Sequence, residues 1–195
     1  MSDTLTAAHA GPAPVVVADR LGVTFANLLC GELPLGDTFT YLSVEGPAWI
    51  RTHLQVDPTP RDWAVGGLSC GGTCPLQLAV NAPPVYPTFL DFAGQDEPTL
   101  GDRASTVNAA VRGSAIVFAP VSPLDVVKGQ RLPATAGVIS AGRDDAEYGP
   151  LAAGSSLPAQ RREMNIHQLP GEHTWAVWAA ALERSVPFFW PAGAV

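Results

Sequence analysis

The segment 48–56, AWIRTHLQV, gives the clearest indication of secondary structure in this sequence. Its apolar and polar residues alternate, with Ile50 and Leu54 on one face and Arg51 and His53 on the other. Successive side chains of a β-strand point to opposite faces, so this alternation is typical of a half-buried strand. We therefore expect a strand here and interpret the rest of the chain from it.

Short runs of β-branched, aromatic and aliphatic residues recur between prolines and glycines on both sides of this segment. The chain has 19 glycines and 19 prolines among 195 residues, which makes it rich in turns. We expect a mainly β fold, a β-sandwich or barrel of about nine short strands with one or two short helices. The expected strands are 15–17, 39–44, 49–56, 76–80, 86–92, 114–119, 126–127, 137–140 and 163–169.

Two segments have helical features. Residues 102–111 contain few helix breakers, and Asp102 is a suitable N-cap, although Ser105 and Thr106 lower the helix propensity. In the segment 174–184 the tryptophans and a leucine recur at helical spacing with alanines between them, which favours a helix over the alternative strand.

The two ends of the chain differ from its middle. Residues 1–13 have little to bury, so we expect a flexible arm followed by one β-rich domain over 14–195, with a subdivision that can fall near 94–113. The arm lacks the features of a secretory signal, and no apolar run is long enough to span a bilayer, so we expect neither secretion nor a membrane partner.

The charge of the chain argues against nucleic acid as a partner. The formal net charge is −7, and Lys128 is the single lysine among eleven basic residues. Charged residues make up 15% of the chain, against the ~25% usual in globular domains. Because interface cores are poor in charge, we expect a homo-oligomer whose surface is largely covered by other subunits.

Three cysteines are present, Cys30, Cys70 and Cys74. In a reducing cytosol we expect them to remain thiols. The C-x3-C spacing of Cys70 and Cys74 falls within the range of a zinc half-site, but no second pair follows, so a tight Gly-Gly turn is the favoured interpretation.

The sequence offers one cluster with acid–base potential, His167 and His173 with Glu163 and Glu172 nearby. A turn at 170–171 with one histidine on each adjoining element is the alternative interpretation. We expect neither Ser69 nor the serine pair at 155–156 to form a nucleophile elbow. The carboxylates are expected to lie on solvated loops rather than in a glycosidase or Ca²⁺ site; they are Asp91, Asp96, Glu97, Asp102, Asp144, Asp145 and Glu147.

The stretch 120–133, PVSPLDVVKGQRLP, followed by AGVI at 136–139 and GPLAAG at 149–154, resembles the β-rich decoration (cement) proteins of tailed-bacteriophage capsids. The resemblance implies a non-enzymatic subunit, often trimeric, that sits over gaps between capsid hexamers and clamps them.

We therefore expect a virion structural protein, made in the host cytoplasm, that contacts capsid or other virion proteins and has no catalytic residue, cofactor or metal. One alternative is a small hydrolase or metal-dependent enzyme using His167, His173 and Glu172, or Cys70 with Cys74. Another is a soluble ligand-binding β module in which Trp49 or Trp63 stacks on a sugar. The expected interface residues are Thr4, Val15, Val16, Val17, Phe188, Phe189 and Trp190.

Overall fold

The computed structural model describes residues 15–18, 27, 29–34, 36–129, 135–149 and 163–189. In these segments one sheet of four parallel strands has the order β3-β4-β5-β6, and a short antiparallel ribbon, β1-β2, precedes it. The register places Leu90 between Gly66 and Val138, and Val138 beside Asn165. The strands are β1 (Glu32–Leu33), β2 (Gly36–Asp37), β3 (Ala64–Leu68), β4 (Thr88–Phe92), β5 (Ala136–Gly142) and β6 (Glu163–Leu169).

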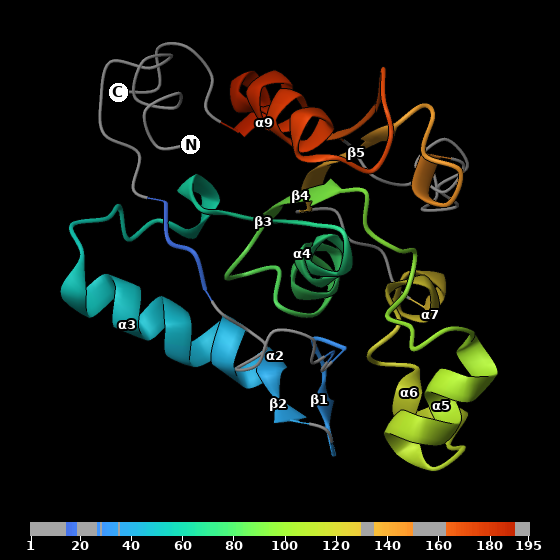
Figure 1. The fold of residues 1–195 in the computed structure, drawn as a ribbon. Coiled ribbons are helices and arrows are strands. Elements are labelled where there is room, and N and C mark those ends of the chain that lie inside the picture. Colours follow the sequence, from blue (N-terminus) through green and yellow to red (C-terminus); the bar gives the residue numbers. More distant parts are fainter. Residues whose placement is uncertain are drawn as a thin grey trace.

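Helices cover both faces of this sheet. Figure 1 shows α4 on one side of the strands and α9 on the other. Helices α5, α6 and α7, which follow β4 and precede β5 in the sequence, lie together away from the sheet. The helices are α2 (Thr38–Thr40), the π-helical turn η1 (Tyr41–Glu45), α3 (Gly46–His53), the 3-10 turn η2 (Pro60–Asp62), α4 (Cys70–Asn81), α5 (Arg103–Val111), α6 (Ala115–Phe118), α7 (Pro123–Gly129) and α9 (Trp175–Phe189).

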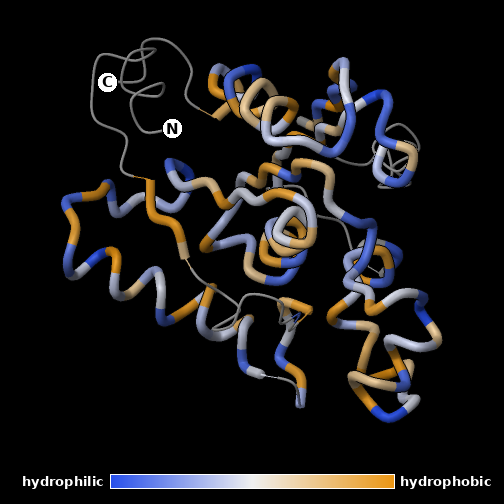
Figure 2. The backbone as a smooth tube through the Cα atoms, in the orientation of Figure 1, coloured by the Kyte–Doolittle hydropathy of each residue, from blue (hydrophilic) through white to orange (hydrophobic). Residues whose placement is uncertain are grey.

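The core consists of apolar layers on the two faces of the sheet. Leu76 and Val80 of α4 pack with Phe89 on one face, and Val177 of α9 packs with Val138 on the other. Figure 2 shows the hydrophobic residues concentrated in the strands and along α4, at the centre of the molecule. Strands buried on both faces are characteristic of a parallel sheet, in which crossover helices cover each side.

The expected β-sandwich or barrel is therefore wrong. The runs 86–92, 137–140 and 163–169 do contain strands, but 76–80, 114–119 and 126–127 lie in helices, and 39–44 lies in α2 and η1. A short apolar run does not distinguish a buried strand from a buried helix. In α4, moreover, the two glycines and Pro75 lower the helix propensity, so packing and not local preference stabilises that helix.

The segment that led to the β prediction is also mostly helical. Residues 46–53 form α3, which continues directly from η1 and has Pro47 in its first turn. The ring of Trp49 stacks on that of His53 one turn later, and Thr52 Oγ1 donates a hydrogen bond to the Ala48 carbonyl oxygen. Most residues of 48–56 are exposed, so burial of one face does not favour the strand period of two over the helical period of 3.6.

Both segments with helical features form helices; the sequence left 102–111 open and favoured a helix at 174–184. Asp102 caps α5, where its Oδ1 accepts a hydrogen bond from the Ser105 N–H at 2.9 Å. Helix α9 begins at Trp175 and includes Phe188 and Phe189, whose side chains pack against the core layer on the α9 face.

The other expected interface residues are partly outside the structure. Thr4, Trp190 and the whole expected arm lie outside the described residues, whereas Val15, Val16 and Val17 are described and exposed, with no strand among them. The interface role of these residues and the trimer stay predictions. Within the described segments, no helix has the length and apolarity needed to cross a membrane.

Candidate active site

Ser69 occupies the sharp turn between β3 and α4. Its backbone has φ 54° and ψ −131°, a conformation that non-glycine residues rarely adopt and that functional sites often retain. The Ser69 N–H donates to the Phe92 carbonyl oxygen at 2.8 Å, and the Gly72 N–H donates to the Ser69 carbonyl oxygen at 2.7 Å. These bonds fix the turn to β4 on one side and to the first turn of α4 on the other.

A glycine two residues before Ser69 makes this turn sterically possible. A Cβ atom at Gly67 would overlap the carbonyl oxygen of Gly71, because strand and helix meet at that point. At Gly71 itself a Cβ would meet nothing within 4 Å. The strained serine between a strand and a helix, within Gly67-Leu68-Ser69-Cys70-Gly71, has the form of a nucleophile elbow.

Ser69 is the first of three side chains joined by hydrogen bonds. Its Oγ lies 2.9 Å from His173 Nε2, and His173 Nδ1 lies 2.8 Å from Asp145 Oδ2. An ionised carboxylate can only accept, so the proton of a neutral His173 is on Nδ1, and Nε2 is left to accept the Ser69 proton. This is the arrangement of a nucleophile, a general base and a group that orients the base.

Asp145 is held in its ionised form. Burial raises the pKa of this carboxyl, but hydrogen bonds from the Tyr148 N–H, from His173 and from the Glu147 N–H lower it more, so the net shift is downward. The two N–H groups donate to Oδ1 at 3.0 and 3.1 Å, which leaves Oδ2 for the imidazole. The Asp145 side chain is 4% exposed, whereas that of His173 is 31% exposed.

The loops that carry Asp145 and His173 are tied together. Arg143 N–H donates to the Leu169 carbonyl oxygen at 2.7 Å, and Asp144 and Gly171 exchange two hydrogen bonds. A Cβ at Gly142 would overlap the Gly171 carbonyl oxygen, so glycine allows the two loops to approach. The spacing between acid and base therefore follows from the backbone of two adjacent strands.

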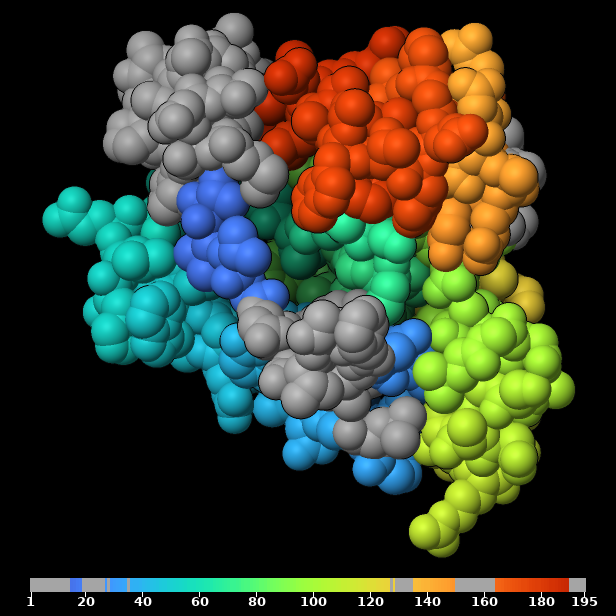
Figure 3. Space-filling view, viewed as in Figure 1, coloured from blue at the N-terminus to red at the C-terminus, as the bar shows by residue number. Residues whose placement is uncertain are grey.

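Two aromatic rings enclose the imidazole of His173. The ring of Tyr148 stacks on it with centroids 4.5 Å apart, and Trp178 of α9 meets it edge-on at 4.9 Å. Figure 3 shows the segment 163–189, in orange and red, against the green surface of α4, so the elements bearing base and nucleophile meet on this face.

Of the residues that the sequence singled out, the structure brings only His173 into the site. Ser69 and Asp145 were missed, and the expectation that Ser69 forms no nucleophile elbow is wrong. The signal was present as G-x-S-x-G directly after a short strand. Asp145 was assigned to a solvated loop, which holds for the exposed Asp144 and Glu147 but not for Asp145.

His167 and Glu172, the other members of the alternative enzyme site, are not part of the hydrogen bonds that join Ser69, His173 and Asp145. His167 is in β6, its Nδ1 is buried, and it has no hydrogen-bond partner among the described residues. Burial, followed by the nearby Arg184 cation, lowers the pKa of His167. Glu172 is exposed next to His173.

Asp91 is a second buried carboxyl close to the elbow, and its expected place on a solvated loop is wrong. It lies in β4, is 3% exposed, and its Oδ1 accepts a hydrogen bond from the Gly94 N–H at 2.7 Å. Burial, only partly offset by that bond and reinforced by the charge of Asp96, raises the pKa of Asp91 to about 8. A Cβ at Gly72 would touch its Oδ1, so the carboxyl packs against the first turn of α4.

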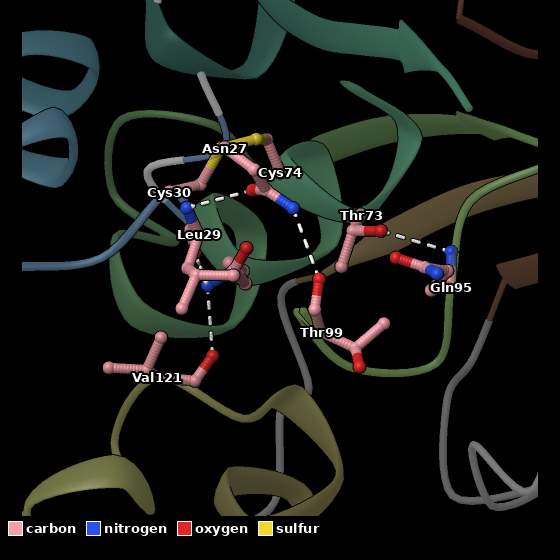
Figure 4. The surroundings of a disulfide bond; sticks show 9 residues. Asn27, Leu29, Cys30, Thr73, Cys74, Gln95, Thr99 and Val121 are labelled. Carbon is pink, nitrogen blue, oxygen red and sulfur yellow. Dashed lines mark hydrogen bonds between the residues drawn. A yellow bond between two sulfur atoms is a disulfide. The ribbon is translucent and has the colours of Figure 1, made fainter. Parts of the chain in front are cut away.

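A disulfide joins Cys30 to Cys74 of α4, with Cα atoms 5.5 Å apart. Figure 4 shows the polar contacts around it, in which the Asn27 side chain donates to the Thr99 carbonyl oxygen and accepts from the Leu29 N–H. The expectation of three thiols is therefore wrong. Cys74 is unavailable as a zinc ligand beside Cys70, and no group of three His, Cys, Asp or Glu in the described segments could hold a metal ion.

The tryptophans proposed to stack on a sugar already have neighbours. Trp49 stacks on His53, the Arg51 guanidinium lies over the ring of Trp63 at 4.7 Å, and Trp63 Nε1 donates to the Asp57 carbonyl oxygen at 2.6 Å. Both residues belong to or adjoin helical segments, so they do not lie on the β-sheet that the ligand-binding β module requires.

No family model matches the sequence. The chain is 35% identical, over an alignment of 201 residues, to an uncharacterized protein of Corynebacterium glutamicum, and the alignment covers 98% of this chain and 46% of that protein. The chain thus spans about half the length of the curated relative that it matches.

Solved hydrolases share the fold. An S-formylglutathione hydrolase from Agrobacterium tumefaciens matches with a TM-score of 0.66 and 16% identity, over 78% of this chain and 56% of the enzyme. A fluorophosphonate-binding serine hydrolase from Staphylococcus aureus matches at 0.61 and 14%, over 84% and 67%. A ferulic acid esterase matches at 0.57 and 19%, over 81% and 62%.

These findings overturn the capsid interpretation. The resemblance to phage decoration proteins, the virion location and the non-enzymatic role are wrong, because the structural neighbours are hydrolases and the structure joins a serine, a histidine and an aspartate. The stretch 120–139 that carried the resemblance contributes α7 and β5 instead of a β-rich module. With a parallel sheet covered by helices on both faces, the described part of the chain has an α/β-hydrolase-like fold.

Proposed function

We propose that this chain is the catalytic part of a serine esterase, in which Ser69 is the nucleophile, His173 the general base and acid, and Asp145 the residue that orients His173. The observation that carries the proposal is the continuous pair of hydrogen bonds, 2.9 and 2.8 Å long, from Ser69 Oγ through the imidazole to the carboxylate.

In the acylation step Ser69 Oγ attacks the carbonyl carbon of an ester, and its proton passes to His173 Nε2. The tetrahedral intermediate then loses its alcohol. The C–O bond breaks, and the Nε2 proton moves to the departing oxygen. Asp145 stabilises the imidazolium that exists between these two transfers.

In the deacylation step water replaces the alcohol. Its proton goes to Nε2 while its oxygen attacks the acyl carbon, and the proton then returns to Ser69 Oγ as the carboxylic acid leaves. The side chains end in their starting states, so no further reactant is required.

The negative oxygen of both intermediates needs hydrogen-bond donors. In elbows of this form one donor is the backbone N–H of the residue after the nucleophile, here Cys70, the first residue of α4. The N-terminus of a helix of this length also favours negative charge.

The names of several solved neighbours support an ester as the substrate of the proposed reaction. The solved neighbours include a ferulic acid esterase and an enterobactin esterase from Shigella flexneri, the latter with a TM-score of 0.55 and 18% identity. Both are esterases by name.

The proposal is tested with a fluorophosphonate probe, which reacts with activated serines, and with p-nitrophenyl acetate. We expect the wild-type chain to be labelled and to release p-nitrophenol, and Ser69→Ala to abolish labelling and lower kcat/KM by about a thousandfold or more. Ser105→Ala, which removes an exposed hydroxyl on α5, is the matched control and should behave as the wild type. Labelling that persists in Ser69→Ala would overturn the proposal.

A further inference from the structure

An aromatic row extends from the catalytic imidazole to the surface. The Trp178 ring meets His173 edge-on at 4.9 Å, and the Trp175 ring meets Trp178 edge-on at 5.1 Å. Both indoles lie on the same side of α9, three residues apart, so they are neighbours on the helix surface.

The two tryptophans differ in burial. Trp178 packs against the apolar layers on both faces of the sheet, which fixes its ring. Trp175, the first residue of α9, is 73% exposed. Trp175 therefore presents a large aromatic ring to solvent, packed against the fixed ring of Trp178 and two residues from the general base in the sequence. An apolar group of a ligand can pack on such a ring.

The chemistry of the triad indicates which part of an ester would reach Trp175. His173 Nε2 delivers its proton to the departing alcohol oxygen, so the alcohol leaves on the imidazole side of Ser69. Trp175 lies beyond the same imidazole, connected to it through Trp178. The indole is therefore on the side of the alcohol and not on that of the acyl group.

The described charges near His173 disfavour a negatively charged alcohol group. Among the described residues of the loops that carry Asp145 and His173, the exposed carboxylates are Asp144, Glu147 and Glu172, and the exposed cation is Arg143. A negatively charged alcohol group would meet net repulsion there, whereas an uncharged aromatic group would not.

We propose that Trp175 binds the alcohol portion of the substrate and that the preferred substrates are uncharged esters of aromatic or other large apolar alcohols. This inference rests on the proposed esterase function and adds the substrate class to it.

The test compares alcohols at a constant acyl group. For Trp175→Ala we expect kcat/KM for 1-naphthyl acetate to fall by about tenfold, the loss of one aromatic contact, and that for methyl acetate to fall much less. The ratio of p-nitrophenyl butanoate to p-nitrophenyl acetate should stay the same, because it reports on the acyl side. For the wild type, 4-carboxyphenyl acetate should be a poorer substrate than phenyl acetate, although its leaving group is at least as good.

Trp49→Ala is the matched control, since Trp49 is also an exposed tryptophan but lies on α3 and stacks on His53. It should leave the alcohol preference unchanged. Equal losses of kcat/KM for naphthyl and methyl acetate in Trp175→Ala, with fluorophosphonate labelling retained, would overturn the role of Trp175 but not the proposed esterase function. Absence of both labelling and turnover in the wild type would overturn the esterase function and this inference together.

Discussion

The ring of Tyr148 lies flat against the imidazole of His173, with centroids 4.5 Å apart and an angle of 27° between the planes. A π-face in this position attracts the cation that His173 becomes when it takes the serine proton. We expect Tyr148→Leu to slow acylation by p-nitrophenyl acetate about tenfold, whereas Tyr148→Phe keeps the ring and stays near the wild-type rate. Both variants retain the Tyr148 N–H bond to Asp145, so equal losses in the two would contradict a role for the ring.

Asp145 orients His173 by accepting its Nδ1 proton. In Asp145→Asn the amide can donate to Nδ1, which moves the imidazole proton to Nε2 and prevents it from accepting the serine proton. We expect kcat to fall by about a thousandfold to ten-thousandfold, measured with p-nitrophenyl acetate.

The neighbouring Asp144→Asn is the control for that variant. Its Oδ2 accepts from the Gly171 N–H, an interaction that an amide oxygen preserves, and its side chain is exposed. Activity should remain close to wild type, and a comparable loss in both variants would exclude a specific role for Asp145.

Gly67 and Gly71 flank the nucleophile but tolerate different changes. Gly67→Ala forces a methyl group into the Gly71 carbonyl oxygen, so we expect the serine to shift and the labelling rate to drop by about a hundredfold. Gly71→Ala meets open space within a helix and should raise stability by about 0.5–1 kcal/mol. Thermal unfolding and fluorophosphonate labelling of the two variants provide the comparison, and identical behaviour would contradict the steric explanation.

Asp91 makes stability depend on pH. Its pKa is about 8 in the folded protein, against the ordinary 3.8 of an aspartate carboxyl, so between these values the folded state holds a proton that the unfolded state lacks. This contribution to stability is fully present below pH ~4 and is lost as the pH rises to 8, at up to about 1.4 kcal/mol per pH unit.

We expect Asp91→Asn to flatten that fall, because the amide stays neutral and can still accept from the Gly94 N–H. Urea unfolding at pH 5 and pH 8 measures the effect, with Asp62→Asn as the control at an exposed carboxylate. An unchanged slope in Asp91→Asn would show that Asp91 is ionised across this range.

Local signals in the sequence were sufficient for some elements. The cap at Asp102 marked the start of α5, the spacing of Trp175 and Trp178 marked α9, and the run 137–140 lies within β5. Helix α4 carries no such signal, because Gly71, Gly72 and Pro75 all disfavour a helix, and its stability comes from contacts distant in the sequence, above all its packing on β3 and β4.

The active site was harder to predict for a similar reason. Ser69 could have been found from its flanking glycines alone. Asp145 stands in an acidic stretch with Asp144 and Glu147, and nothing local indicates which of the three carboxylates turns inward. That choice depends on β6 and its loop, whose His173 lies 28 residues further along the chain.

The disulfide between Cys30 and Cys74 closes a span of 44 residues and ends in the helix that begins next to Ser69. A cross-link over such a span stabilises a fold by about 2–4 kcal/mol, and cross-links of this kind persist only in oxidising surroundings. The helix next to Ser69 is thus anchored by a bond that glutathione or thioredoxin could reduce. In reducing surroundings this disulfide would not form, and α4, the helix that follows Ser69, would be less firmly anchored.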